Sequence, residues 1–504
     1  MSGALLSKEI YEELELTEKV IIYGTGIIAA KCFNQLQLKG YLNKVICFTE
    51  TTKSLKDTFC GLPILEYHEL TLNWNLESCF FLIAVGNNKF YEEIEENIFK
   101  SGNISYADGR KIIFDSMDCS ENELKKRQEN VRNYLLKESC LKQNGEKIVA
   151  SHVTYPYIGN AGDTFLSYCV RHFLNWDSWN IINVADTVNE KIIDSINETD
   201  VLIIGGGGLF LPDTNKNLIS GWQWAITNEL LKKINVPVYV FSVGYNYFKG
   251  QHASELFIDS VQKLVEKAEF VGLRNKGSVE AIQNFLPERL RHKVIYQPCT
   301  TSFSYEYLAN ASKINKSVNT RIVAINMAFD RSERRFGVNK IAICREVAKA
   351  IKMIEDQGFS IVFVAHCDED FEFLVYLEEI GVNYRKLNLS YRLPDEIMKF
   401  YKKCHIVIGM RGHAQMIPFG LNRNIITLGT HNKMRWFLED IDFMDLYVDL
   451  TNVDEIQEGI LNIFNYINRN LDILQKRREC VLKELHNISI VNKGMMEQKL
   501  REGE

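Results

Sequence analysis

The sequence predicts an α/β protein made of two tandem Rossmann-like lobes, with a small Rossmann-like domain before them. Short apolar runs alternate with segments of helical periodicity along most of the chain, which is the pattern of βαβ units and parallel sheets. Several of these runs end in glycine-rich turns, where parallel sheets bind ligands. The length of 504 residues also exceeds what one core supports, so about three domains are expected.

The first domain is expected over residues 1–116, with strands at Lys19–Tyr23, Lys44–Phe48 and Cys79–Val85. Its first strand runs into Gly24-x-Gly26-x-x-Ala29 at the start of a helix, where exposed N–H groups favour an anion. Glu50 follows the second strand and suits a ribose hydroxyl, although a tight turn that binds nothing fits equally well. The layout resembles the small nucleotide-sugar-binding domain that precedes the catalytic part of some bacterial sugar acyltransferases.

The rest of the chain divides into a connector, two lobes and a tail. Residues 117–145 are charged and helical in pattern, and we interpret them as the connector. The first lobe covers residues 146–305, with strands predicted at Lys147–Val153, Asp200–Ile204, Val236–Val243, Phe270–Leu273 and Lys293–Tyr296. The second lobe covers residues 306–452, with a helix at Lys340–Gln357 and strands at Arg321–Asn326, Ser360–Ala365, His405–Ile408 and Asn424–Leu428. Residues 453–504 form a charged helical tail.

Two glycine-rich segments of the first lobe are candidates for substrate binding. Gly159-Asn160-Ala161-Gly162-Asp163 lies between a strand and a helix, and Asp163 can cap that helix. Gly205, Gly206, Gly207 and Gly208 follow a buried strand, where four glycines make most sense if a ligand comes close. A capped turn and a close chain crossing are the structural alternatives. Trp222 and Trp224 offer aromatic faces for a sugar ring, or pack in the core.

Cations stand at the ends of three later strands. Arg274 directly follows Phe270–Leu273, and a guanidinium is a two-pronged donor for carboxylate or phosphate. Arg411 and His413 lie in the turn after His405–Ile408, which places a cation beside a group that titrates near neutral pH. Lys433 follows the next strand and adds a further cation. A surface or ion-paired arginine and a helix-capping histidine are the alternatives.

Taken in order, these motifs resemble the polysaccharide pyruvyl transferase family over about residues 147–450. That family has a Gly-Asn-x-Gly-Asp loop, a Gly-Gly-Gly strand end, a strand-ending Arg-Asp and an Arg-x-His before a late helix, often with a lysine after the next strand. This sequence departs from the pattern at Asn275, where aspartate is usual, and at Gln297-Pro298-Cys299, where a Pro-Asp-Pro-like turn is common. The family fold resembles the two-lobed glycosyltransferase-B type, in agreement with the tandem lobes.

The resemblance implies a transferase that moves pyruvate from phosphoenolpyruvate to a sugar diol of a bacterial surface glycan, forming a ketal and phosphate. Arg274 and Arg411 would hold the donor, and His413 would act as general acid. Asn160 or Asp163 would orient the acceptor, free or lipid-linked. We expect no cofactor and no metal, since phosphoenolpyruvate is itself a substrate and no metal-ligand spacing is visible.

Composition restricts the partners and the location. A net charge of −6 gives no overall attraction to nucleic acid, so an anionic substrate needs a local cluster of cations. The 12 cysteines form no CxxC and, with no secretion signal, are typical of reduced cytoplasmic thiols. No apolar stretch reaches about 18 residues, so no membrane-spanning helix is expected. Peripheral association with the inner face of a membrane and homo-oligomerisation remain open.

Two other functions fit the same patterns. A glycosyltransferase of the B type would use the two lobes and the same cations to bind the diphosphate of a nucleotide sugar. A non-catalytic sugar-nucleotide-binding protein of a glycan gene cluster would bind without turnover. The Arg411 and His413 pair argues against the second alternative, since a scaffold has no need of a titrating group beside a cation.

Overall fold

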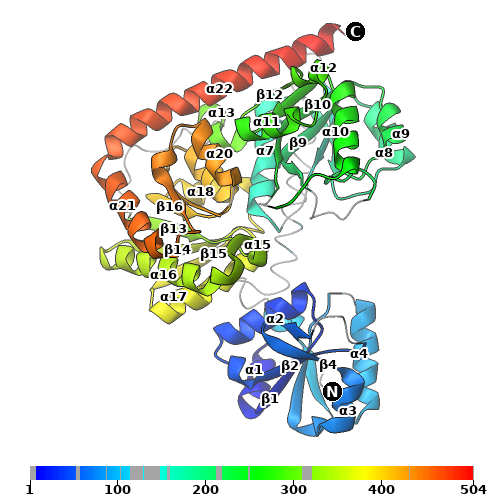
Figure 1. The fold of residues 1–504 in the computed structure, drawn as a ribbon, viewed down its shortest axis with the longest axis vertical. Coiled ribbons are helices and arrows are strands. Elements are labelled where there is room, and N and C mark those ends of the chain that lie inside the picture. The colour runs from blue at the N-terminus through cyan, green and yellow to red at the C-terminus, as the bar shows by residue number, and fades with distance from the viewer. Residues whose placement is uncertain are drawn as a thin grey trace. The chain divides into compact units, whose positions relative to one another are not determined.

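The computed structural model describes residues 7–52, 57–86, 88–102, 104–113, 126, 129, 148–155, 159–211, 218–247, 250–308, 321–430 and 432–502. The predicted connector at 117–145 therefore lies outside the described residues, apart from Lys126 and Glu129. The described chain contains three six-stranded, almost entirely parallel sheets flanked by helices (Figure 1). This confirms the predicted α/β fold with a small Rossmann-like unit and two tandem Rossmann-like lobes.

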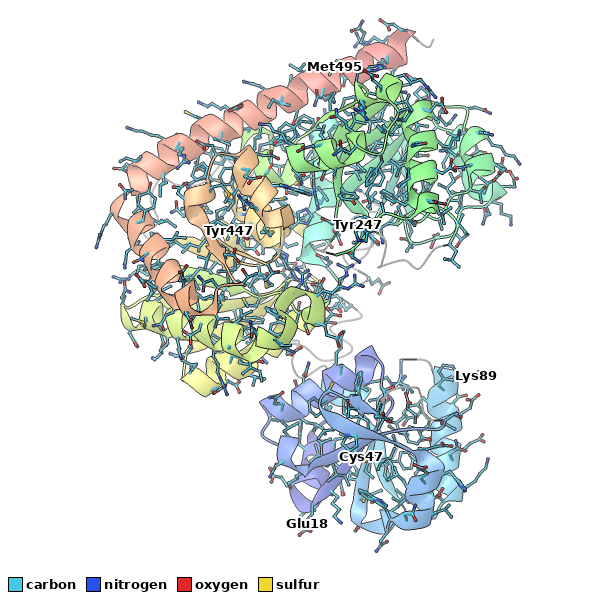
Figure 2. The ribbon with its side chains drawn as sticks, viewed as in Figure 1. Glu18, Cys47, Lys89, Tyr247, Tyr447 and Met495 are labelled. Atoms are coloured by element: carbon cyan, nitrogen blue, oxygen red, sulfur yellow. The ribbon has the colours of Figure 1, made fainter. Side chains whose placement is uncertain are left out.

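The N-terminal module has the sheet order β3-β4-β2-β1-β5-β6, and only β3 is antiparallel. Its strands are β1 (Lys19–Tyr23), β2 (Val45–Glu50), β3 (Thr58–Phe59), β4 (Leu62–Glu66), β5 (Cys79–Ile83) and β6 (Ser105–Asp108). Its helices are α1 (Ser7–Leu16), α2 (Ile27–Leu38), α3 (Tyr67–Asn73), α4 (Asn88–Lys100) and α5 (Arg110–Ile113). Figure 2 shows Cys47 of β2 within this module, where its side chain is fully buried. The sequence missed β3, β4 and β6, since each has only one buried position or none.

Lobe 1 is the unit around the second sheet, whose order is β12-β11-β10-β9-β7-β8. The strands are β7 (Val149–Thr154), β8 (Ser178–Asn183), β9 (Val201–Phe210), β10 (Val238–Tyr245), β11 (Phe270–Leu273) and β12 (Val294–Tyr296). The helices are α7 (Ala161–Leu174), α8 (Glu190–Asn197), α9 (Asn228–Lys232), α10 (Glu255–Lys267), α11 (Lys276–Gln283), α12 (Glu288–Arg291) and α13 (Ser304–Tyr307). Strand order reverses between β7 and β9, which is the position where such sheets bind ligands.

Lobe 2 is the unit around the third sheet, whose order is β15-β14-β13-β16-β17-β18. The strands are β13 (Ile322–Asn326), β14 (Ser360–Ala365), β15 (Tyr384–Asn388), β16 (Ile406–Gly409), β17 (Asn424–Gly429) and β18 (Tyr447–Asp449). The helices are α15 (Ser332–Phe336), α16 (Lys340–Asp356), α17 (Leu374–Ile380), α18 (Pro394–Tyr401), α19 (His413–Gly420) and α20 (Asn432–Asp440). Here the order reverses between β13 and β16, as in the dinucleotide-binding Rossmann sheet.

The first helix of lobe 1 joins the two lobes. Ala161 and Phe165 of α7 belong to the same buried apolar cluster as Val362 and Val407 in the sheet of lobe 2. The carboxyl ends of the strands of both lobes meet beside α7. Apolar burial at this junction therefore fixes the relative position of the two sheet edges on which ligands are expected.

The predicted C-terminal tail forms two helices, α21 (Ile456–Arg469) and α22 (Leu471–Glu502), and α22 runs along both lobes (Figure 1). On lobe 2, the buried guanidinium of Arg478 donates to Oδ1 of Asn422 at 2.6 Å and of Asn424 at 2.8 Å. On lobe 1, the Tyr239 hydroxyl donates to the carbonyl oxygen of Met496 at 2.9 Å. Figure 2 labels the neighbouring Met495 on this part of α22. No helix among the described residues has the length and apolar character needed to cross a membrane.

Candidate functional site

A cavity of about 460 Å³ lies where the carboxyl edges of the two sheets face each other. Both strand-order reversals contribute to it, since β7 is followed by Tyr155 and Asn160, and β16 by Arg411 and His413. The lining residues are Tyr155, Asn160, Asp163, Gly208, Leu211, Asn246, Arg274, Asp330, Arg331, Arg335, His366, Cys367, Met410, Arg411, Gly412 and His413. The structure therefore brings together six of the predicted site residues: Asn160, Asp163, Gly208, Arg274, Arg411 and His413.

Arg274 reaches the cavity from the end of β11 and is only 3% exposed. One of its terminal nitrogens donates to Oδ1 of Asn246 at 3.1 Å, while its Nε has no hydrogen-bond partner among the described residues. Burial lowers the pKa of this guanidinium, and the neighbouring Cys299 and Asp163 oppose that shift. A buried cation with an unused donor is costly unless an anion completes its contacts.

Two glycines make room for Arg274. A Cβ added to Gly244 would lie 2.2 Å from Nε of Arg274, and one added to Gly208 would lie 2.0 Å from Nδ2 of Asn246. Gly208 of β9 and Gly244 of β10 therefore allow the Arg274 and Asn246 pair to lie directly against the backbone. The atoms that come close to Gly208 belong to this cavity-lining pair, and a role for Gly208 in substrate binding stays a prediction.

His413 is the first residue of α19 and is held by close packing on two sides. Sγ of Cys299 lies 3.8 Å from its Nε2. On the other side, a Cβ added to Gly162 in the first turn of α7 would lie 2.5 Å from its Nδ1. The position of the imidazole thus depends on the absence of a side chain at Gly162.

Arg411 is neutralised by two carboxylates. Its Nε donates to both oxygens of Asp370, at 2.9 and 2.8 Å, and Asp370 is fully buried. A terminal nitrogen lies 2.8 Å from Oδ1 of Asp330. Burial alone would lower the pKa of Arg411, but Asp330 and Asp370 raise it well above its ordinary value. This geometry favours a positioning role for Arg411 over the anion-holding role expected from the sequence.

Two cavity-lining arginines were not identified from the sequence. Arg331 and Arg335 follow β13, and both contact Asp330, at 3.6 and 2.9 Å respectively. Despite its burial, Asp330 has a pKa far below its ordinary value because of Arg411, Arg335 and Arg331. The available signal was the basic run that begins directly after Asp330, close to the end of a predicted strand.

The loop before α7 differs in one detail from the prediction. The residue that caps α7 is Asn160, whose Oδ1 accepts from the Gly162 N–H at 2.9 Å. Asp163 lies in the first turn of the helix and lines the cavity. Gly159 adopts φ +117°, and its N–H donates to the carbonyl oxygen of Ser390 in lobe 2. The motif therefore ties the lobes together and leaves the Asp163 side chain at the cavity.

One expectation for lobe 1 is wrong, and for the two tryptophans the core-packing alternative holds. The glycines at Gly205–Gly208 do not follow the strand but continue it, because β9 extends to Phe210. Gly206 packs against Leu166 of α7, and an added Cβ would lie 2.9 Å from that side chain. Trp222 and Trp224 are fully buried and contact each other in the core, so neither is a platform for a sugar.

Both departures from the family pattern have a structural role. Asn275 caps α11, where its Oδ1 accepts from the Ser278 N–H at 2.7 Å. Gln297 is fully buried and binds α22, since its Nε2 donates to Ser489 and its Oε1 accepts from Asn492. The Lys433 side chain lies outside the described residues.

In the N-terminal module, the structure places the predicted turn between β1 and α2. Gly24 has φ +119°, and an added Cβ would lie 2.9 Å from the carbonyl oxygen of Ala84. Gly26 caps α2 without a side-chain bond, whereas Ala29 is buried in the core. The Thr25 hydroxyl donates to Glu50, so this carboxylate already accepts a hydrogen bond within the turn. A nucleotide-sugar ligand here stays a prediction.

Solved structures to which part of this chain is similar include an epimerase and a synthase. UDP-GlcNAc 2-epimerase from Neisseria meningitidis, bound to UDP-GlcNAc, is 11% identical, with a TM-score of 0.44 over 71% of this chain and 100% of that one. Sucrose-phosphate synthase from Thermosynechococcus elongatus is 12% identical, with a TM-score of 0.42 and the same two coverages. No curated protein matches the sequence.

One family matches over more than half of the chain. The sequence model of polysaccharide pyruvyl transferase matches residues 140–432, which is 432 − 140 + 1 = 293 of 504 residues. The matched segment contains the whole of lobe 1 and the strand ends of lobe 2 that carry Arg411 and His413. The chain therefore belongs to the polysaccharide pyruvyl transferase family.

Proposed function

We propose that the protein transfers pyruvate from phosphoenolpyruvate to a sugar diol of a bacterial surface glycan or its precursor. The observation that carries this proposal is Arg274, a buried cation whose Nε lacks a partner among the described residues and which lines a cavity together with His413. A trianionic donor would supply an acceptor for this unused Nε. The family membership of the chain supports the same reaction.

Arg274 is the group that holds the donor phosphate. Its guanidinium lies against Gly208 and Asn246, so a phosphate there meets a cation and an amide. As the C2–O bond to phosphate breaks, negative charge grows on the departing oxygen. A preorganised cation in a site with little water stabilises that charge.

The reaction needs two proton movements, and the cavity offers two groups for them. The methylene carbon of phosphoenolpyruvate gains one proton and becomes a methyl group, while C2 loses phosphate and forms two C–O bonds. The two acceptor hydroxyls release two protons, one of which balances the methyl group and the other the phosphate. His413 supplies the proton to the methylene carbon, and Asp163 receives one from a hydroxyl; both residues line the cavity.

Phosphoenolpyruvate is a soluble trianion, so we place the reaction in the cytoplasm. With a lipid-linked acceptor, the protein would work at the inner face of the membrane. The sugar would occupy the part of the 460 Å³ cavity that the small donor leaves open.

The test is release of phosphate from phosphoenolpyruvate with a panel of sugars that carry free vicinal or 1,3-diols. His413→Ala is expected to lower turnover by about 10²–10⁴-fold, because general acid–base groups contribute that much. His292→Ala is the matched control, since His292 is exposed at the end of α12.

Near-wild-type turnover of the His413→Ala protein would exclude His413 as the proton-transfer group. Wild-type protein that binds UDP-sugars in calorimetry, but neither binds nor cleaves phosphoenolpyruvate, would contradict the proposed function. That result would favour the nucleotide-sugar glycosyltransferase instead.

A further inference from the structure

We propose that Cys299 acts through His413 as a positioning residue, in a proton relay behind the cavity that consists of Thr301, Cys299 and His413. This inference rests on the proposed pyruvyl transfer, in which His413 supplies a proton to the methylene carbon. The thiol gives His413 a proton at one ring nitrogen as the other nitrogen releases a proton to the donor. Cys299 belongs to the segment in which the sequence departs from the family pattern, so the thiol is not part of that pattern.

The two ring nitrogens of His413 face different surroundings. Nε2 lies 3.8 Å from Sγ of Cys299, which is 2% exposed and is not among the residues that line the cavity. Nδ1 lies on the side of Gly162, where an added Cβ would be 2.5 Å from it. Gly162 stands between Asn160 and Asp163, which both line the cavity. Nε2 is therefore directed to the buried thiol, and Nδ1 is the nitrogen on the substrate side.

The Thr301 hydroxyl directs the thiol proton to His413. Its oxygen lies 3.2 Å from Sγ of Cys299, and the Thr301 side chain is fully buried. A buried hydroxyl needs an acceptor for its proton, and within the described part of the chain that acceptor is this sulfur. Because the sulfur accepts from Thr301, the proton of the thiol itself is left to point at Nε2. A hydrogen bond received at Nε2 fixes the neutral imidazole with its proton on Nδ1.

Close packing between the lobes holds the three side chains together. Thr301 lies in the 3₁₀ helix η5 (Thr300–Phe303) of lobe 1, directly after Cys299, whereas His413 begins α19 of lobe 2. At the other end of α19, a Cβ added to Gly420 would clash with the carbonyl oxygen of Thr301. The segment 299–301 therefore contacts both ends of α19, so the thiol and the start of the helix keep a fixed relative position.

The relay moves two protons and leaves a negative charge on sulfur. His413 gives its Nδ1 proton to the methylene carbon while Nε2 takes the proton of the Cys299 thiol. The resulting thiolate accepts from the Thr301 hydroxyl and interacts with the Arg274 guanidinium, whose pKa burial lowers and Cys299 raises. When the second sugar hydroxyl reacts, its proton goes to Nδ1 and Nε2 returns a proton to sulfur. The relay thus ends each turnover in its starting state.

The relay keeps the acid active above neutral pH. An isolated imidazole with the ordinary pKa of about 6.5 is only about 3% protonated at about pH 8. A thiol generally keeps its proton to a pH about two units higher. A neutral imidazole that is backed by a thiol can therefore supply a proton at a pH where an imidazole alone is almost entirely deprotonated.

Other titratable groups also face the relay. Arg274, Tyr296 and Tyr307 interact electrostatically with Cys299, and Asp163 and Arg411 line the cavity together with His413. Burial raises the pKa of both tyrosines well above the ordinary value, so neither ionises near neutral pH. Asp440, near Tyr296, has a pKa that burial raises to about 7. Every variant below keeps Asp440, so its effect cancels in the ratio of variant to wild type.

The first test compares kcat for phosphate release at about pH 6 and about pH 8, with the full chain. For Cys299→Ala we expect kcat within about threefold of wild type at the lower pH, where the imidazole itself is largely protonated, and about 30-fold below wild type at the higher pH. Cys404→Ala is the matched control, since this thiol is also buried but contacts the carbonyl oxygen of Phe400, at 3.7 Å. It is expected to show the wild-type ratio between the two pH values.

Two variants of Thr301 test the relay with the thiol in place, should Cys299→Ala be unstable. Thr301→Val keeps the shape of the side chain but removes the hydroxyl, and it is expected to lower kcat at about pH 8 by about 2- to 10-fold, as the loss of one hydrogen bond does. Thr301→Ser is expected to restore it. Equal rates for these two variants at the higher pH would contradict the relay.

The second test needs no turnover. Nitrogen NMR of histidine-labelled protein, assigned with His413→Gln, is expected to show the neutral His413 ring with its proton on Nδ1 in wild type and on Nε2 in Cys299→Ala. A proton on Nε2 in wild type would overturn the inference, as would an equal loss of kcat at both pH values for Cys299→Ala. Failure of wild type to release phosphate with any acceptor would overturn the proposed function instead, while the nitrogen spectra would still decide whether Cys299 sets the position of the proton.

Discussion

Gly162→Ala tests whether the position of His413 controls activity. The added Cβ would lie 2.5 Å from Nδ1 and 2.7 Å from Cβ of His413. Ordinary contacts between such atoms begin at about 3.5 Å, so the imidazole must retreat by about 1 Å. A misplacement of that size costs about 10²-fold in rate, or about 2.7 kcal/mol in the activation barrier. We therefore expect kcat for phosphate release to fall by about two orders of magnitude.

The assay compares kcat, KM for phosphoenolpyruvate and the thermal midpoint of the variant with those of wild type. Gly494→Ala in α22 is the control, because a Cβ there would meet no atom within 4 Å and alanine is the better helix former. The expected outcome is a large loss of kcat at a nearly unchanged midpoint for Gly162→Ala, and full activity for Gly494→Ala. Turnover of Gly162→Ala within twofold of wild type would refute the reasoning, since the helix would then have moved and not the ring.

Two further predictions concern stability. Asp370→Asn leaves the Arg411 guanidinium buried beside a neutral amide, so it should lower the free energy of unfolding in urea by about 3–5 kcal/mol. As the control, removal of the exposed Glu379 charge should lower that free energy by less than about 1 kcal/mol. Equal losses for the two variants would contradict this. Burial raises the pKa of Asp440 from 3.8 to about 7 in the folded state. Between about pH 4 and pH 7 the folded protein therefore holds a proton on Asp440 that the unfolded chain does not hold. The free energy of unfolding consequently falls as pH rises from about 4 to about 7. Asp440→Asn keeps an acceptor for the Lys276 N–H and should flatten that part of the curve; an unchanged slope would exclude Asp440 as its source.

The sequence located the strand ends of the site because buried strands leave clear apolar runs. Arg274 and Arg411 each stand directly behind such a run, and parallel strands bring their carboxyl ends to one edge. The edge strands β8 and β15 were missed for the complementary reason. Strand β8 has two buried positions among its six residues and β15 has one among five, so neither shows a continuous apolar signal.

The electrostatic pairing of the site could not be predicted in the same way. Asp370 precedes Arg411 by 41 residues, and Asp330 precedes it by 81, and no local pattern links these positions. Only the tertiary structure shows that two carboxylates neutralise Arg411 and that Arg274 has an unused Nε. The sequence identified the arginines of the strand ends, but which of them can accept a ligand depends on contacts between distant segments.

The position of the long helix α22 at the end of the chain also affects lobe 1 during synthesis on the ribosome. The Tyr239 hydroxyl of lobe 1 donates to Met496, and the Gln297 side chain binds Ser489 and Asn492; all three partners lie on α22, which begins at Leu471. Lobe 1 is complete in sequence at about residue 308, so the ribosome must add 471 − 308 = 163 residues before that helix starts to emerge. At about 5–20 residues per second this takes roughly 8 to 33 s. During that interval, chaperones would encounter a lobe that still exposes groups, such as the Tyr239 hydroxyl, that α22 buries in the mature protein.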